Sequence, residues 1–455
     1  MLIQTQSQLK DSVLDQIAEI ANVAQFASFD PDLKHRHLRI RGVAAGHQFD
    51  SVGATVEELL RSAGSVNVRT FDPHNDKSRE FIYGLMDPQQ VTTEVSRLAL
   101  LGLFTIINET IDVNDGGVSG VALGNLIEFA PGDTPRCVEK PGTLALPRNL
   151  ATPLLERVYG FPPDLDHYRP SERIEFSVHP LRRGLKNDHT IIWEVEEVGS
   201  FESEVDIIWP NRFSRFIGDK AFGLLLADTL GFRVPATTVF PRSLPPFTFG
   251  RRTGSGETWI RTCPAEPDPG RYATHKGWLD PFELLAREDP DGKTIASVLA
   301  QEGVNATHSG SLIVERDGSV TIEGVSGYGD DFMLGRSSFG SLPGAVTDSV
   351  LQLYRQVAAR LGPVRFEWVH DGENAWIVQL HKGATMTLGF MIYPGEPEMV
   401  HRFEVHEGID SLRKLIKSIG SGEGITIVGE IGVTSHFGDL LRKAKIPSKI
   451  ETKTS

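Results

Sequence analysis

The sequence predicts an α+β protein with an N-terminal α+β region, a larger central body and a small C-terminal α/β segment. Three observations support this prediction. The 455 residues are enough for two to four domains with cores of their own. Segments with helical periodicity alternate with short strand-like runs, and two apolar runs near residue 370 flank a turn, as in a β-hairpin. We expect the three parts to cover residues 1–200, 201–390 and 391–455.

The predicted hairpin reads VRFEWVHDGENAWIVQ, from Val364 to Gln379. A three-residue loop at 372–374 places Glu367 opposite Gln379 on a polar face, whereas a two-residue loop mixes polar with apolar side chains. The first register is therefore expected, and it pairs Trp368 with Val378 and Phe366 with Leu380. A carboxylate beside an amide suits a magnesium-bound phosphate, although a half-buried surface hairpin needs no such role.

The composition is that of an ordinary soluble globular protein, with 40% hydrophobic and 23% charged residues. A net charge of -14 disfavours a general nucleic-acid or anionic-membrane surface. Cys137 and Cys263 are too few for a disulfide framework, so a reducing compartment is expected. Because neither a signal segment nor a run of membrane-spanning length is seen, we expect a cytoplasmic protein.

The N-terminal region carries no motif that assigns it a role. A helix is expected at Leu9–Ala24, strands at 66–71 and 121–131, and a proline-rich joint at 159–170. The acidic, glycine-rich stretch Asn108–Gly120 has two interpretations. It binds a metal or a phosphate, or it is only a turn between strands.

The hairpin resembles the end of the ATP-grasp nucleotide-binding domain in the phosphoenolpyruvate synthase and pyruvate phosphate dikinase family. That family has the pattern IEW, a short turn, and ILQ followed by arginine and proline. The resemblance implies that Glu367 and Gln379 lie at the magnesium and phosphate end of an ATP site. His381 stands where the family usually has arginine, which leaves one phosphate contact open.

Two upstream segments extend the resemblance. Gly218–Val239 follows the family order of lysine, amphipathic helix, glycine, Val-Pro and strand, so Lys220 corresponds to the lysine at a phosphate-binding helix start. An exposed first-turn lysine is the alternative. The run WIRTCP, from Trp259 to Pro264, stands where the family has a strand reading VRSS, and this makes Arg261 the catalytic arginine that contacts the nucleotide phosphates.

The longest similar stretch is Ile295–Gly335, which resembles a hydrophobic strand, a Ser-Gly strand and a glycine-rich GLGE turn of the family. The resemblance implies four further site residues: Gln301 and Glu302 at the hinge beside the adenine, Glu323 facing magnesium, and Asp330 at the acidic position of the turn.

The C-terminal segment resembles the phosphohistidine motif of the family's swivelling domain. Thr434-Ser435-His436 is followed by a helix with Arg442, and Ile446-Pro447 closes it, at the family's spacing. The resemblance implies that His436 carries a phosphoryl group; the alternative is a helix capped by Ser435 beside an idle imidazole. Only 19 residues follow His436 (455 − 436), and the phosphoenolpyruvate-binding barrel of the family is absent from the sequence.

These features together predict an ATP- and Mg-dependent phosphotransferase of dikinase type, with a phosphohistidine at His436 as one route and an acceptor that is either a small molecule or of unknown kind. Two alternatives remain open. One is a component that binds ATP without turnover, as a sensor or scaffold; the other is an ATP-grasp ligase, which leaves His436 unused. The sequence does not name the acceptor.

Overall fold

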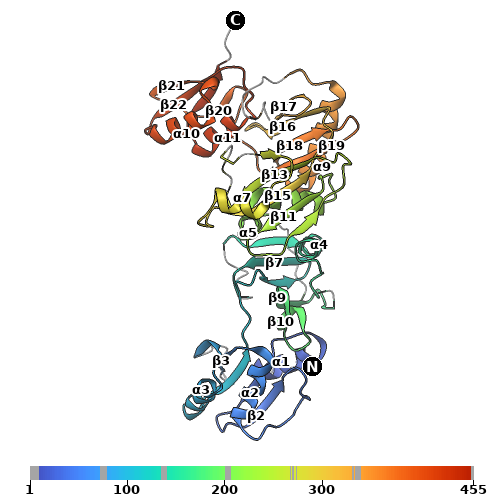
Figure 1. Ribbon diagram of the computed structural model, residues 1–455, viewed down its shortest axis with the longest axis vertical. Coiled ribbons are helices and arrows are strands. Elements are labelled where there is room, and N and C mark those ends of the chain that lie inside the picture. Colours follow the sequence, from blue (N-terminus) through green and yellow to red (C-terminus); the bar gives the residue numbers. More distant parts are fainter. Residues whose placement is uncertain are drawn as a thin grey trace. The chain divides into compact units, whose positions relative to one another are not determined.

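The computed structural model describes residues 10–71, 79–134, 141–165, 167–199, 206–266, 268, 271–272, 274–329, 333 and 340–451. The chain divides into two compact units, Met1–Ile208 and Trp209–Ser455. Each unit contains both helices and sheets, and the predicted α+β class is confirmed (Figure 1). The finer division at residues 200 and 390 stays a prediction.

The first unit contains two five-stranded sheets, with orders β2-β1-β5-β3-β4 and β10-β9-β6-β7-β8. One core fills the space between the first sheet and helices α2 and α3, because the inward faces of these elements are apolar. The elements are α1 (Lys10–Ile20), β1 (Phe26–Phe29), β2 (His35–Arg39), α2 (Val52–Ala63), β3 (Val66–Phe71), β4 (Phe81–Leu85), α3 (Pro88–Leu100), β5 (Phe104–Glu109), β6 (Val118–Leu123), β7 (Leu126–Pro131), β8 (Leu144–Pro147), α4 (Arg148–Tyr159), β9 (Glu172–Arg183) and β10 (Asp188–Glu197).

Sequence patterns located only a few of these elements: the strand predicted at 66–71 is β3, and the predicted N-terminal helix is α1. The first helix stops at Ile20, four residues before the predicted end at Ala24. The single strand predicted at 121–131 is wrong: residues 118–131 form an antiparallel hairpin, β6 and β7. Gly124, at the turn, has a φ of 58°, a conformation that favours glycine and lets the chain reverse.

The second unit contains the body that the sequence predicts to be ATP-grasp-like, and we keep the name ATP-grasp-like body for it. This body is made of two antiparallel sheets, ordered β12-β11-β15-β13-β14 and β17-β16-β18-β19. Helix α6 packs on β19, and α9 packs on β18 and β19. The elements are α5 (Arg212–Ile217), α6 (Asp219–Thr229), β11 (Thr237–Pro241), β12 (Phe247–Phe249), β13 (Thr258–Pro264), β14 (Thr274–Lys276), α7 (Pro281–Glu288), β15 (Ile295–Glu302), β16 (His308–Val314), β17 (Val320–Ser326), α9 (Gly344–Leu361), β18 (Val364–His370) and β19 (Ala375–Lys382).

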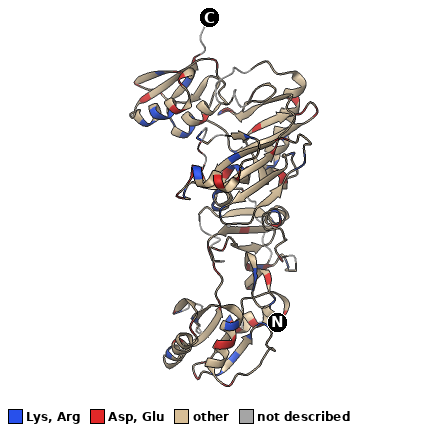
Figure 2. Ribbon diagram, viewed as in Figure 1, with Lys and Arg blue, Asp and Glu red and all other residues tan. Residues whose placement is uncertain are grey.

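The C-terminal segment adds a small sheet of order β20-β23-β22-β21, in which β22 lies parallel to both neighbours. Its elements are β20 (Met391–Tyr393), β21 (Met399–Glu404), the 3₁₀ turn η2 (Val405–Glu407), α10 (Ile409–Ser418), β22 (Glu423–Val428), α11 (His436–Ala444) and β23 (Ser448–Glu451). Helices α10 and α11 carry much of this segment's lysine and arginine (Figure 2). The core of the segment includes Ile313 from β16 of the ATP-grasp-like body, so the two parts are packed together.

The hairpin β18–β19 confirms the predicted pairing of Glu367 with Gln379 and of Phe366 with Leu380. The predicted pairing of Trp368 with Val378 is wrong, since a β-bulge after Glu367 pairs Trp368 with Ile377 instead. The cause is the loop, which has four residues rather than three: Asp371 accepts hydrogen bonds from the backbone N–H groups of Glu373 and Asn374 at 2.8 and 2.7 Å.

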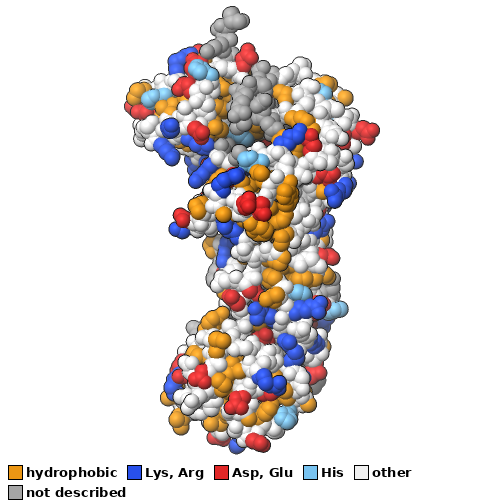
Figure 3. All heavy atoms as spheres, viewed as in Figure 1, with side chains coloured by type: hydrophobic (Ala, Val, Ile, Leu, Met, Phe, Trp, Pro, Cys, Tyr) orange, Lys and Arg blue, Asp and Glu red, His pale blue; other side chains and the backbone are white. Residues whose placement is uncertain are grey.

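Acidic and basic side chains are interspersed over the visible face of the molecule (Figure 3). None of the helices that the structure describes has the length and apolar character needed to span a bilayer.

Candidate functional site

A cavity of about 580 Å³ lies between the two sheets of the ATP-grasp-like body. Strands β13 and β15 of one sheet and β18 and β19 of the other provide opposite walls, and α6 and α11 each contribute one side chain. Most of the predicted site residues line this cavity: Lys220, Arg261, Gln301, Glu302, Glu367, Gln379 and His436. Residues from six separate segments of the chain therefore meet where the sequence resemblance predicted a nucleotide.

Lys220 is the second residue of α6, at the positive end of the helix. Burial lowers the pKa of its ammonium group, and the nearby Arg261 lowers it further, while Glu367 acts in the opposite direction. Among the described residues, the ammonium group has neither a hydrogen bond nor an ion pair. A half-buried cation without a partner favours an anionic ligand, and the alternative of an exposed first-turn lysine is wrong.

Glu367 and Gln379 lie side by side on adjacent strands, as their register places them. No hydrogen bond reaches the Glu367 carboxylate from another described residue. The Gln379 side-chain nitrogen lies 3.0 Å from Nε2 of His381, and the other ring nitrogen of His381 lies 3.0 Å from Asp219. His381 therefore connects the Glu367–Gln379 pair to the first turn of α6.

Asp219 is buried at this first turn. Burial raises the pKa of its carboxyl group, but hydrogen bonds from His381 and Trp209 outweigh this effect and hold the pKa below its usual value. The carboxylate therefore stays charged and fixes the orientation of the His381 ring.

Arg261 has a structural role that the sequence resemblance did not predict. Its side chain is only 8% exposed, and one guanidinium nitrogen donates to the Val378 carbonyl at 2.6 Å and to the Gln301 side chain at 3.3 Å. The bulge in β19 leaves Val378 outside the strand ladder, so that its carbonyl is available to Arg261. Arg261 thus joins the two sheets at the bottom of the cavity, while still lining it.

Gln301 and Glu302 lie at the end of β15, where the resemblance predicted the hinge. Gln301 is buried and donates to the Thr237 hydroxyl at 3.1 Å. The Glu302 carboxylate accepts a hydrogen bond from the Gly254 N–H at 3.0 Å, which attaches the glycine-bearing loop 251–257 to the cavity rim. Both side chains are positioned by bonds within the protein.

Aromatic residues at the cavity mouth were missed by the sequence prediction. Trp259 and Tyr328 lie with ring centroids 5.9 Å apart, and the Lys276 ammonium lies 5.7 and 5.3 Å from the two rings. Their faces offer a stacking surface for a planar base. Trp259 precedes Arg261 by two residues on the same strand, and side chains two residues apart on a strand point to the same face. This alternation could have indicated from the sequence that Trp259 lies beside Arg261.

His436 is the first residue of α11, and it lies against the same cavity. The side chain is 22% exposed; its Nδ1 atom is 3.7 Å from Asp439 and has no hydrogen-bond partner within the described part of the chain. Ser435 takes the extended N-cap conformation, but its buried hydroxyl makes no capping bond. The alternative of a serine-capped helix is therefore not supported by a capping bond.

Glu323, predicted to face magnesium, has another set of partners. Register places Glu323, Ser311 and Glu367 on three successive strands, so two strand spacings, roughly 10 Å, separate the Cα atoms of the two glutamates. The Glu323 carboxylate accepts from the N–H groups of Val433 and Thr434 at 3.1 and 2.9 Å and from the Thr434 hydroxyl at 2.6 Å. It holds the loop before His436, and we do not assign it to the metal.

Gly432 lies close to this carboxylate. A Cβ at Gly432 would lie 2.2 Å from one Glu323 oxygen, so a larger residue there would require the end of the Glu323 side chain to move. The predicted residue Asp330 lies outside the described residues. No group of three or more His, Cys, Asp or Glu suited to a metal occurs within the described ranges, so Glu367 and Gln379 are the remaining predicted ligands.

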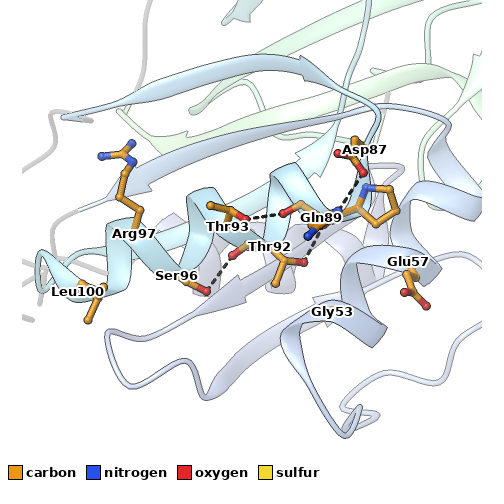
Figure 4. Close-up of a pocket in the computed structure, with 10 residues that line it drawn as sticks. Gly53, Glu57, Asp87, Gln89, Thr92, Thr93, Ser96, Arg97 and Leu100 are labelled. Atoms are coloured by element: carbon orange, nitrogen blue, oxygen red, sulfur yellow. Dashed lines mark hydrogen bonds between the residues drawn. The ribbon is translucent and has the colours of Figure 1, made fainter.

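The first unit contains a groove of about 740 Å³ beside α3 (Figure 4). The hydroxyl groups of Thr92, Thr93 and Ser96 that line it donate to carbonyls one turn earlier in the helix, and Arg97 pairs with Glu80 and Glu94. These polar groups are satisfied by their own helix and its neighbours. The groove therefore shows no arrangement of groups that indicates a ligand.

The acidic stretch predicted as a turn or a metal site is also engaged internally. Asp115 lies 2.9 Å from Nδ1 of His179, and the Glu109 carboxylate accepts from Gln25. The interpretation as a turn between strands describes it better, because these carboxylates already have protein partners.

Neither protein-family models nor curated proteins match this chain. Solved structures that resemble part of it include an L-amino acid ligase from Bacillus licheniformis (TM-score 0.24, 10% identity, 36% of this chain and 40% of that chain) and D-cycloserine synthetase DcsG (TM-score 0.25, 16% identity, 49% and 69%). A D-alanine-D-alanine ligase from Helicobacter pylori is similar over 36% of this chain and 51% of its own, with a TM-score of 0.23 and 12% identity. TM-scores this low carry no argument about function. Membership of the dikinase family stays a prediction.

Proposed function

We propose that the cavity between the two sheets binds ATP with Mg²⁺, and that the protein is an ATP-dependent phosphotransferase in which His436 receives the phosphoryl group. The observation that carries this proposal is the position of His436. It lines the same cavity as Lys220, Glu367 and Gln379, although 57 residues separate it from the nearest of these in the chain (436 − 379).

The residues present fit a magnesium–nucleotide complex rather than a protein-enclosed metal. Mg²⁺ bound to nucleotides takes only one or two protein ligands, together with phosphate oxygens and water. Glu367 supplies a carboxylate that accepts no hydrogen bond from another described residue, and Gln379 lies beside it. These two side chains would hold Mg²⁺, which would neutralise phosphate charge.

The protein's own side chains perform the remaining tasks. Trp259 and Tyr328 offer a face for the base, and Lys220 offers the phosphates a charge that has no partner among the described residues. Arg261 keeps the two walls at a fixed separation through its bond to Val378. His436 presents an imidazole whose Nδ1 is unbonded among the described residues, with Asp439 close enough to stabilise a positive ring.

An ATP-dependent ligase is the second candidate, and one observation favours it. The Glu367–Gln379 pair also lines an adjacent cavity that contains Arg365 and Arg215. Arg215 is paired with Glu266 at 3.2 Å, so Arg365 is the cation that suits a carboxylate substrate. A ligase of this kind produces ADP and leaves His436 unmodified.

The experiment that separates the two candidates uses ATP labelled with ³²P at the β or the γ position. Dikinase-type transfer places β label on His436 as an acid-labile, base-stable adduct and releases AMP and phosphate. The adduct should be absent from His436→Ala. ADP formation at the parental rate by His436→Ala would overturn the phosphohistidine proposal and favour the ligase.

A further inference from the structure

A second cavity, of about 650 Å³, adjoins the first. Five residues line both cavities: Lys220, Met333, Glu367, Gln379 and His436. Other residues line the second cavity alone, and they come from both the ATP-grasp-like body and the C-terminal segment. They include Arg215, Ile313, Arg365, Phe366, Thr385, Met386, Tyr393, Asp439 and Lys445. His436 therefore borders two compartments at once.

The C-terminal segment is held so that His436 stays at this border. Three hydrogen bonds join Glu323 to the loop before it, and Ile313 of β16 belongs to the core of the segment. Arg442 of α11 donates to the Thr387 hydroxyl at 3.0 Å, which ties the helix to the connection between β19 and β20. Contacts of this number and burial favour one fixed position over a swinging one.

Six lysine and arginine side chains line the second cavity together with five carboxylates and apolar surface, and two of the cations, Arg365 and Lys220, are weakly paired or unpaired among the described residues. Arg365 has only Asp439, at 3.8 Å, as an ion-pair partner among the described residues, and Asp439 is already 2.8 Å from Arg442. Lys220 has no partner of its own in the same part of the chain. Phe366 and Ile313 provide buried apolar wall, and Met386 is 40% exposed beside them. Such a surface suits an anion that also has an apolar part.

We propose that this second cavity binds the phosphoryl acceptor, a small organic anion with an apolar portion and a hydroxyl group, and that His436 serves both cavities without moving between distant sites. This inference rests on the proposed function. In the transfer, the acceptor hydroxyl oxygen attacks phosphorus and forms the new O–P bond. The N–P bond of phosphohistidine breaks, the imidazole keeps its electron pair, and the hydroxyl proton passes to the ring. The products are a phosphate ester and neutral His436.

A binding test uses 8-anilinonaphthalene-1-sulfonate, an aromatic anion, as the probe on the full chain. Met386→Trp narrows the second cavity and should weaken probe binding by about tenfold or more. Leu388→Trp is the matched control, because Leu388 is 42% exposed in the same connection but does not line the cavity. A non-hydrolysable ATP analogue should not displace the probe. Equal binding by the two variants, or displacement by the analogue, would overturn the proposal.

A second test uses the phosphoenzyme made with β-labelled ATP. Bound probe should slow the discharge of the label by hydroxylamine in the parent and in Leu388→Trp, but not in Met386→Trp. If phosphoenzyme forms and the probe gives no protection, the acceptor cavity is wrong while the proposed function stands. If the parent protein forms no phosphoenzyme, the proposed function fails, and the acceptor role of the cavity fails with it.

Discussion

Replacing Glu323 by glutamine tests whether this carboxylate positions the histidine loop. One oxygen accepts from Val433 N–H, and the other accepts from the N–H and hydroxyl groups of Thr434. An amide keeps only one acceptor oxygen and presents an NH₂ group to a donor. Hydrogen bonds to a charged group contribute about 1.5–3 kcal/mol each, and the bonds here share one side chain, so the expected loss is about 2–4 kcal/mol.

That loss corresponds to an increase of about 30- to 900-fold in local opening of the loop. Hydrogen exchange measured by mass spectrometry on peptides that cover residues 432–436 reports this opening directly. Phosphorylation of His436 should slow in the same variant. Glu373→Gln is the control, since Glu373 is exposed in the hairpin turn and its side chain bonds to no described residue. If both variants exchange like the parent at residues 432–436, Glu323 does not position the loop.

Four further substitutions separate binding, chemistry and stability. Lys220→Ala should weaken binding of a Mg²⁺–ATP analogue by about 1.5–3 kcal/mol in calorimetry, and parental affinity would remove Lys220 from the site. Arg261→Ala should lower both affinity and the free energy of unfolding of the second unit, because the Val378 carbonyl loses its partner; a change in affinity alone would contradict the bridging role. Glu367→Gln should leave the midpoint of thermal unfolding unchanged and abolish Mg²⁺-dependent turnover. Parental activity of this variant at saturating Mg²⁺ would contradict a role of Glu367 in holding the metal. Burial opposes ionisation of Asp439, but Arg442 and His436 hold the pKa of its carboxyl group far below the usual 3.8. The charged carboxylate therefore stabilises the fold above pH 3.8, and this stabilisation is lost as the pH falls. In Asp439→Asn the free energy of unfolding should fall less steeply on acidification than in the parent, and an unchanged pH dependence would contradict the stabilising role of Asp439.

Local patterns in the sequence predicted the hairpin and its Glu367–Gln379 pair because strand alternation and turn chemistry act over short distances, whereas the other candidate site residues were named from the family resemblance. The pairing of Glu367 with Gln379 follows from side-chain alternation alone. The bulge after Glu367 does not, since it depends on how Asp371 closes a four-residue loop. That bulge also decides the role of Arg261, by leaving the Val378 carbonyl free to accept its hydrogen bond.

The role of Glu323 was beyond sequence reasoning because its partners are more than 100 residues away in the chain. The family resemblance implied that Glu323 faces magnesium, and only the three-dimensional position of the loop at residues 432–434 reveals the hydrogen-bond partners of its carboxylate. The ring contact between Trp259 on β13 and Tyr328, which follows β17, likewise joins two segments far apart in the chain. Contacts between distant segments require the packing of the two sheets, which periodicity does not specify.

The most direct test of the account is an experimental structure of the full chain with Mg²⁺ and a non-hydrolysable ATP analogue. The account predicts the base against Trp259 and Tyr328, the phosphates within bonding distance of Lys220, Mg²⁺ at Glu367 and Gln379, and the His436 ring facing the phosphate chain. Nucleotide bound outside the cavity between the two sheets, or within it but with the phosphates directed away from His436, would contradict the account.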